Sequence, residues 1–333
     1  MQTEFSEKNF YLEIKDNSKD LLILIARLFE DQLQNWKLAS DGYNSLKSVR
    51  KKIFMFDGFS IEAQFNAGRI VSSSAKVDDR SIKQRPCFLC QANLPKEQKA
   101  VKLFDDYILL VNPFPIFNKH FTIPLLKHVS QSIHAEFESL LNLSSLLGKN
   151  YSVFYNGPKC GASAPDHMHF QAGNFGFMLI ENELESIIKK YGQLILFDSE
   201  IKLFIVSDSM RNYFVLKGNK ISNLKVEFDK IYTALLNNSS SEEPMLNIIC
   251  NYTNEWTILI FPRSKHRPSY FFEENDKQIL ISPAAVDFGG VLIFPREEDF
   301  KHITKELVID IFQQVSISKD FFDNVLQKLL TNN

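Results

Sequence analysis

Two histidines and a glutamine, His167, His169 and Gln171, alternate along a short stretch in the middle of the chain. If this stretch is extended, alternate side chains point to one face, so the two imidazoles and the amide lie together. Met168 and Phe170 then point into apolar packing on the opposite face. A neutral imidazole can ligate a metal, or it can act as a nucleophile or general base. The pattern therefore predicts a site on one face of a strand.

The loop before the histidines is rich in small and turn-forming residues and contains Gly161, Ala162 and Ser163. Its backbone N–H groups and the serine hydroxyl suit the oxygens of a phosphate group. A bare His-x-His on an edge strand is usually only solvated or hydrogen-bonded. Here the loop, the imidazoles and the amide occur together, which favours a functional site.

The segment Asn-x(10)-His-x-His-x-Gln from Asn156 to Gln171, with Gly-x-Ser before the histidines, resembles the active-site segment of the histidine-triad superfamily. It is most similar to the branch with Gln as the third member. That branch contains galactose-1-phosphate uridylyltransferase, diadenosine tetraphosphate phosphorylase and plant GDP-L-galactose phosphorylase. The wording Arg-Pro-Cys-Phe-Leu-Cys, Asn-Pro-Phe-Pro-Ile-Phe and Cys-Gly-Ala-Ser-Ala-Pro-Asp-His resembles an uncharacterised bacterial group in it. The resemblance is dense over residues 66–173, thinner over 247–300 and absent before 60.

The resemblance implies an α+β fold, with a histidine-triad-like antiparallel sheet, flanking helices and two such halves. We expect residues 1–60 to form an N-terminal helix and strands that cover the core. Residues 61–180 then form the catalytic half, and residues 181–333 a second, degenerate half with terminal helices. Strands 246–252 and 256–261, followed by Pro-Arg-Ser-Lys-His-Arg, echo the first hairpin of residues 108–124 and indicate this duplication.

Apolar periodicity predicts the remaining elements. Helices are expected at 19–37, 130–149, 228–236 and 303–330, with a short helix between 180 and 194. Strands are expected at 46–66, 152–155, 177–180, 194–197, 203–206 and 212–216, and residues 282–296 are expected to form a small-residue turn that leads into a buried strand.

Cys87 and Cys90 have the spacing of half a tetrahedral zinc site. Four cysteines in 333 residues do not make a disulfide scaffold, and no thioredoxin-like context supports a redox pair. The resemblance implies a structural zinc held by Cys87, Cys90, His128 and His167. His128 fits better than His120, because it follows the Ile-Pro-x-x-x-His wording of the relatives. The alternative is four unrelated side chains.

Two basic segments are candidates for phosphate binding. Arg69 and Lys76 flank three serines. Composition alone favours a solvated loop there, whereas the resemblance implies a phosphate contact and leaves the choice between the two cations open. Residues 263–267 are the most basic stretch of the chain. We interpret them as a second phosphate- or substrate-binding edge, with Lys265 and Arg267 as its contacts, and a solvated turn is the alternative.

The resemblance implies nucleotidyl transfer through a covalent nucleotidyl-histidine. His169 would attack the α-phosphorus of a nucleoside polyphosphate or nucleotide-sugar, and Ser163, Gln171, Asn156 and the loop amides would stabilise the charged oxygens. Phosphate, water or a sugar phosphate would then accept the nucleotidyl group. Gln171 favours transfer over hydrolysis. The motifs are more similar to those of the phosphorylases than to those of the uridylyltransferases, which favours a purine as the base of the nucleotide. Asp166, where the uridylyltransferase has Pro, orients an imidazole or caps the loop.

Two other classes remain open. A zinc-dependent nucleotide hydrolase would use His167 and His169 as ligands of an open metal site. A non-catalytic nucleotide sensor would bind through the same loop without turnover, although a pure binder has no need of a nucleophile.

Composition limits the partners. A net charge of −2 and 44% hydrophobic residues fit a globular protein, and they argue against a general nucleic-acid or membrane-surface binder. The N-terminus has no export pattern and no apolar run reaches membrane-spanning length, so we expect a cytoplasmic protein. The sequence does not set the oligomeric state, and a homodimer is compatible with it.

Overall fold

The computed structural model describes residues 18–70, 78–104, 106–236 and 243–331. Its strands are β1 Arg50–Met55, β2 Ser60–Phe65, β3 Ala100–Leu103, β4 Tyr107–Val111, β5 His120–Pro124, β6 Tyr151–Asn156, β7 His169–Asn174, β8 Gly192–Phe197, β9 Ile201–Ser207, β10 Asn212–Gly218, β11 Leu246–Tyr252, β12 Trp256–Pro262 and β13 Val291–Phe294.

Its α-helices are α1 Ser18–Asn35, α2 Lys37–Ser45, α4 Asp79–Gln84, α5 Phe137–Leu147, α6 Leu179–Tyr191, α7 Ile221–Leu235, α8 Ala285–Phe288, α9 Glu297–His302, α10 Lys305–Val315 and α11 Lys319–Thr331. Among these described helices, none is long and apolar enough to cross a membrane.

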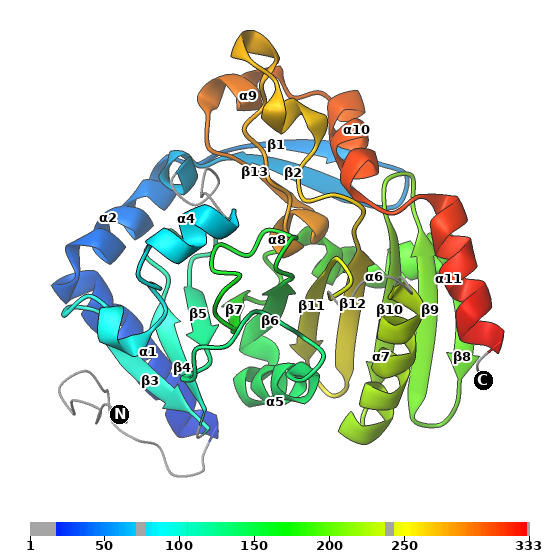
Figure 1. Ribbon diagram of the computed structural model, residues 1–333, viewed down its shortest axis with the longest axis horizontal. Helices are drawn as coiled ribbons and strands as arrows, with labels where there is room; N and C mark the ends of the chain where they lie inside the picture. The colour runs from blue at the N-terminus through cyan, green and yellow to red at the C-terminus, as the bar shows by residue number, and fades with distance from the viewer. Residues whose placement is uncertain (1–17, 71–77, 105, 237–242, 332–333) are drawn as a thin grey trace.

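One ten-stranded antiparallel sheet runs through the molecule in the order β3-β4-β5-β7-β6-β11-β12-β10-β9-β8 (Figure 1). Its two halves have the same connectivity. In each half three strands are followed by a helix, α5 or α7, and then by two strands that add in reverse order. The halves meet where β6 pairs with β11, with Asn156 opposite Asn247. The predicted fold class and duplication are therefore confirmed.

The repeat differs from the sequence-based comparison in one respect. Strands β11 and β12 occupy the place of β6 and β7, the strands on either side of the loop 157–168, rather than the place of the hairpin β4–β5. The sequence pattern of strand, proline and basic residues had matched β11 and β12 to the wrong pair of strands, because short apolar strands before a proline look alike in sequence.

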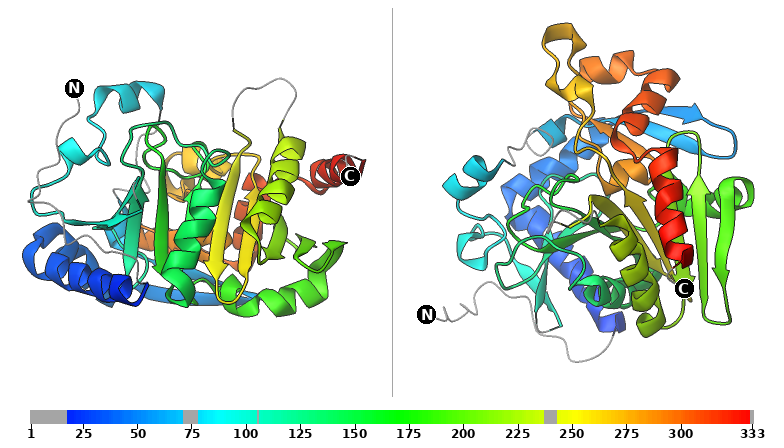
Figure 2. Two further views of the ribbon diagram at one scale, coloured as in Figure 1. Left: turned by 90° about the horizontal axis from the view of Figure 1, so that it is seen from below. Right: turned by 45° about the vertical axis from the view of Figure 1, so that its right-hand side comes forward.

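The two faces of the large sheet pack against different layers. Helices α1, α2, α5, α7 and α11 cover one face of the sheet (Figure 2). The rings of Phe137 in α5 and Phe228 in α7 stack with their centres 3.8 Å apart. Met168 and Phe170 point into this core. Helices α6, α8 and α10 and the small sheet β1-β2-β13 cover the other face. Because strand side chains alternate, His169 and Gln171 face this second layer.

Most predicted elements are present, with three corrections. Residues 177–180 do not form a strand: α6 begins at Leu179, and Glu181 accepts hydrogen bonds from the N–H groups of Gly176 and Met178 at 2.7 and 3.2 Å. The helix expected from residue 130 begins at Phe137. The small-residue turn at 282–290 contains α8. Residues 71–77, and Lys76 with them, lie outside the described residues.

Candidate active site

His169 is the first residue of β7, and both its side chain and its backbone are hydrogen-bonded. Its side chain is buried, and its Nδ1–H donates to the backbone oxygen of His167 at 2.8 Å. Nδ1 therefore carries the proton, and the lone pair lies on Nε2. Burial lowers the pKa of His169 to about 4, so the imidazole is neutral near pH 7.

Gln131 clamps the start of β7 to the end of β6. Its side-chain oxygen accepts from the N–H of His169 at 2.8 Å, and its amide nitrogen donates to the backbone oxygens of His169 and Asn156, both at 3.0 Å. No pattern in the sequence signals this role, because Gln131 lies in a loop far from both partners along the chain. The clamp fixes the position of His169 relative to Asn156.

Gln171 is oriented by a second histidine, His120 of β5. The N–H of Ile116 donates to Nδ1 of His120 at 3.2 Å, so the proton of the neutral ring lies on Nε2. Nε2–H then donates to Oε1 of Gln171 at 3.0 Å. Gln171 therefore keeps its amide N–H groups for another acceptor. Burial, with the charge of Arg69 adding to it, lowers the pKa of His120 to about 3, which keeps the ring neutral.

The loop between β6 and β7 carries the predicted phosphate-binding residues Gly161, Ala162 and Ser163. Gly161 has φ +96°, and a Cβ there would lie 2.6 Å from the Cβ of Ala284. This close approach requires glycine and brings the segment before α8 against the loop. Asn156, at the start of the loop, accepts from the N–H of Ala285 at 2.9 Å. The second part of the chain therefore forms one wall of the site.

Arg85 holds the other end of this loop. One of its Nη atoms donates to the backbone oxygen of Ser163 at 3.3 Å and to Asp166 at 3.0 Å. Asp166 thus pairs with an arginine, whereas the sequence predicted that it orients an imidazole or caps the loop. The interaction joins the loop to the segment that carries Cys87 and Cys90.

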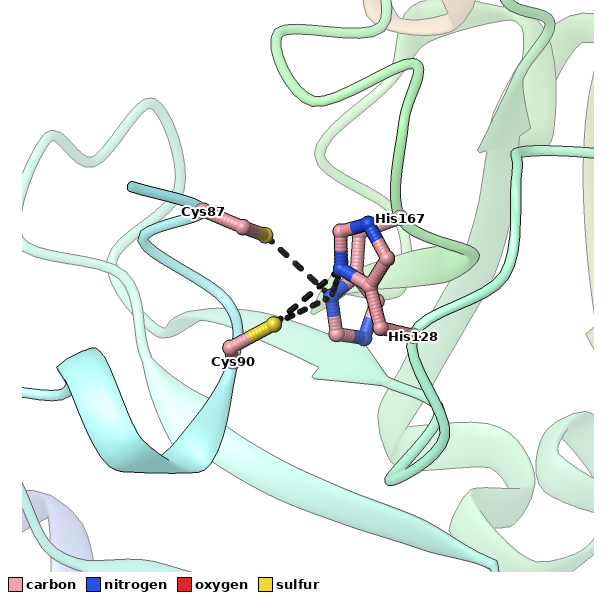
Figure 3. A group of neighbouring side chains, drawn as sticks. All are labelled: Cys87, Cys90, His128 and His167. Carbon is pink, nitrogen blue, oxygen red and sulfur yellow. Dashed lines mark hydrogen bonds between the residues drawn. The ribbon is translucent and has the colours of Figure 1, made fainter. Parts of the chain in front are cut away.

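Cys87, Cys90, His128 and His167 come together as a group of four possible metal ligands, with their ligand atoms within 4.8 Å of one another (Figure 3). The Sγ atom of Cys87 lies 3.2 Å from Nδ1 of His167, and that of Cys90 lies 3.1 Å from Nδ1 of His128. Nε2–H of His167 donates to the backbone oxygen of Leu125 at 2.7 Å. The lone pair of Nδ1 is therefore directed at the cluster, as in metal-bound histidines.

This donor set fits a metal. Two thiols and two imidazoles close a tetrahedron without an open position, which is typical of a structural site. The choice of His128 over His120 agrees with the geometry, because His120 binds Gln171 instead.

The structure separates the basic residues predicted to bind phosphate. Arg69 donates to the backbone oxygen of Phe114 at 2.6 Å, and its buried Nε has no hydrogen-bond partner among the described residues. Burial lowers the pKa of Arg69 to about 10, so it stays charged near pH 7. It lies close enough to His120 to affect the pKa of that ring. Arg69 is thus beside the site.

Lys265 and Arg267 follow β12, at the edge of the second half. Lys265 lines a cavity of about 620 Å³ together with Lys159 of the catalytic loop. Arg267 donates to the hydroxyl of Ser282 at 3.1 Å, and its guanidinium lies 3.9 Å from the ring centre of Phe271. Arg263, in the same basic stretch, is not an anion contact: it is buried, and five protein oxygens accept from its three nitrogens.

Two crystal structures of yeast Ap4A phosphorylase Apa2 are similar to this chain. The structure in complex with AMP is 17% identical, covers 86% of this chain and 97% of that chain, and gives a TM-score of 0.55. A second structure of the same phosphorylase is 18% identical, covers 84% of this chain and 96% of that chain, and gives a TM-score of 0.56. The chain therefore shares the fold of this phosphorylase.

Two family models match different parts of the chain. Residues 28–174 match a domain of unknown function, DUF4922, and residues 187–332 match the GDPGP1-like, C-terminal domain. The first match ends with β7, where the first half of the sheet ends. A comparison with curated protein sequences found no match. The family matches and the fold confirm the resemblance stated from the sequence.

Proposed function

We propose that this protein is a nucleotidyltransferase of the phosphorylase type, which acts on a nucleoside polyphosphate or nucleotide-sugar through a covalent nucleotidyl-His169 intermediate. The observation that carries the proposal is the hydrogen bond from Nδ1–H of His169 to the backbone oxygen of His167. It leaves Nε2 of a neutral imidazole as the nucleophile.

The reaction proceeds in two displacements. Nε2 of His169 forms a bond to the α-phosphorus, and the bond from phosphorus to the bridging oxygen breaks, so that oxygen departs with its electron pair. An oxygen of the acceptor then attacks the same phosphorus, and the P–N bond breaks and returns the lone pair to His169. Inorganic phosphate as the acceptor gives a phosphorylase, and a sugar phosphate gives a transferase.

The groups around His169 are suited to the charge on the transferring phosphoryl group. We assign its oxygens to the amide N–H groups of Gln171 and Asn156, the hydroxyl of Ser163 and the amides of Gly161 and Ala162. Arg69 is the cation beside them, with a buried Nε that has no partner among the described residues. Lys265 and Arg267 are proposed for phosphates farther from His169, and Lys76 stays a prediction.

We propose zinc as the metal of Cys87, Cys90, His128 and His167, in a structural role. When bound, it would fix the segment before His169, because His167 is one of its ligands and Asp166 binds Arg85. A zinc hydrolase would need His169 as a ligand and an open position. The donor set of Cys87, Cys90, His128 and His167 is complete without His169 and leaves no open position.

The two halves then have different tasks. We propose that residues 61–180 carry out catalysis, and that residues 181–333 supply the wall of the site and the contacts to distal phosphates.

Intact-protein mass spectrometry tests the proposal. The protein is incubated separately with ATP, GDP-hexose, UDP-hexose and diadenosine tetraphosphate, without an acceptor. We expect a mass increase of one nucleoside monophosphate with at least one donor, absent in His169→Ala and discharged by inorganic phosphate. Absence of an adduct with every donor, in protein that binds nucleotide, would refute covalent catalysis and favour a nucleotide sensor.

A further inference from the structure

Asn156 meets Asn247 at the junction of the two halves. The two residues are directly opposite in the register of β6 and β11, and both are buried. The side-chain nitrogen of Asn247 donates to Oδ1 of Asn156 at 2.9 Å and to the backbone oxygen of Cys160 at 2.8 Å. Asn247 thus binds the last residue of β6 and Cys160 in the loop that follows it.

Arg263 fixes which way Asn247 points. An Nη atom of Arg263 donates to Oδ1 of Asn247 at 2.5 Å and to the backbone oxygen of Pro283 at 2.9 Å. An arginine has donors and no acceptor, so only the oxygen of Asn247 can face it. The nitrogen of Asn247 must then face Asn156.

The same logic continues to Asn156. Its Oδ1 receives two donors, Nδ2 of Asn247 and the N–H of Ala285. An inverted amide would place N–H groups against both donors and leave these buried groups unpaired, which is destabilising. The oxygen of Asn156 is therefore held on the side of the second half, and its N–H groups are left for another acceptor.

We propose that Arg263 and Asn247 are positioning residues, which act through Asn156 to present an amide N–H donor to the anionic phosphoryl group bound beside His169. The inference rests on the proposed function and deepens it, because it gives the second half a part in transition-state stabilisation. His120 orients Gln171 in a parallel way from the first half. A site with two amides locked as donors selects anionic ligands and disfavours cationic ones.

The test uses the full-length protein and the substitution Asn247→Asp. The new carboxylate keeps the size of the side chain and its contact with Arg263. It replaces the N–H donor to Oδ1 of Asn156 by a second acceptor, so the two oxygens repel each other. We expect adduct formation with the best nucleotide donor to slow by about 100-fold, the loss typical of one donor in an oxyanion site. The matched control is Asn251→Asp, a buried asparagine on the same strand at the far end from Asn156, for which we expect an unchanged rate.

A double-mutant cycle separates positioning from general damage. If Asn247 acts only through Asn156, the variant Asn156→Ala/Asn247→Asp has the rate of Asn156→Ala alone. Additive losses, or a wild-type rate for Asn247→Asp, would overturn the proposal. Arg263→Lys keeps a donor to Asn247, and we expect it to retain more activity than Arg263→Met. If Asn247→Asp does not fold, Asn247→Ser runs the same cycle with the same criteria.

Binding gives a second readout that needs no covalent step. AMP and GMP titrated calorimetrically into the four proteins of the cycle report whether the donor of Asn156 contacts the phosphate. We expect weaker binding in Asn247→Asp and no further weakening in the double variant. One outcome separates the two proposals: the wild type binds AMP or GMP but forms no adduct, and the variants lose affinity in this non-additive way. That outcome would contradict the proposed reaction and leave this inference intact. Unchanged affinity and unchanged rate would refute the inference alone.

Discussion

The Nε2 atom of His120 lies 3.0 Å from the side-chain oxygen of Gln171. The two residues lie on neighbouring strands, β5 and β7, and are 51 positions apart in the sequence. Because the N–H of Ile116 occupies the other ring nitrogen, His120 is the donor of this bond. One buried imidazole therefore decides which end of the Gln171 amide faces the site.

Replacing His120 by Phe tests this orientation. The substitution keeps a ring but removes the donor, so Gln171 loses the contact that holds its amide. We expect nucleotidyl transfer to slow by about 10- to 100-fold, as for partners that orient a reacting group. Single-turnover adduct formation measures this. Tyr43→Phe is the control, because the hydroxyl of Tyr43 binds the backbone of His120 and not its ring. Equal rates in His120→Phe and wild type would contradict the assignment.

Arg85→Gln tests the link between the metal-binding segment and the catalytic loop. The variant loses the contacts to Ser163 and Asp166, so the loop is held less firmly. We expect a loss of about 10-fold in the rate of adduct formation, with the metal still bound. Asp166→Asn should give a similar loss, and Arg80→Ala, at an exposed position of α4, should give none. Loss of the metal in Arg85→Gln would instead show a role in forming the metal site.

Cys90→Ser tests the metal site itself. Serine is a poor ligand for zinc, so we expect the bound metal to fall from one equivalent to near zero in plasma emission measurements of protein purified without chelator. The midpoint of thermal unfolding should fall by about 4 °C or more, since metal bound only by the folded state stabilises it. Cys250→Ser, at a buried free thiol in β11, should keep the metal. A metal content equal to wild type in Cys90→Ser would rule out this cluster as the site.

Glu181 predicts a dependence of stability on pH. Burial raises the pKa of its carboxyl to about 7, above its ordinary value of 4.5. Between these two values the folded state holds a proton that the unfolded state releases. The contribution of Glu181 to stability is therefore fully present below pH 4.5 and is lost as the pH rises through about 7. Between pH 5 and pH 8 we expect the free energy of unfolding of the wild type to fall by about 2 kcal/mol relative to that of Glu181→Gln, measured by urea unfolding. If the free energy of unfolding of the wild type changed with pH over this range in the same way as that of the variant, the raised pKa would be contradicted.

The sequence predicted most of the fold because its strands and helices have clear apolar periodicity and clear boundaries. The strands around Asp57 and Gly58 form the hairpin β1–β2, and Gly58 has φ +92°. The error at residues 177–180 has a local cause: these four residues are all apolar and look like a short buried strand, although the last two are the first residues of α6. The parallel pairing of β2 with β13 joins segments more than 220 residues apart, and no local pattern signals it.

The metal cluster and the catalytic strand could be predicted for a different reason. Cys87 and Cys90, like His167 and His169, are close in sequence, so spacing brings each pair together, whereas His128 and His167 were assigned to the metal cluster through the resemblance. His120, Asn247 and Arg263 act on residues 51, 91 and 16 positions away, through contacts that exist only after folding. Their types suggested a zinc ligand, a strand interior and a phosphate contact. Only the tertiary structure identifies them as orienting groups.

The repeated topology also predicts the stoichiometry of the proposed reaction. Strands β6 and β7 are joined by residues 157–168, which form the catalytic loop, whereas β11 and β12 are joined by residues 253–255 alone. The second half thus kept the strands of its counterpart and has, between β11 and β12, no segment that could surround a phosphate. The proposed reaction therefore has one nucleophile per chain, and we expect labelling by a nucleotide donor to saturate at one nucleotide per chain, whatever the number of chains in the assembly.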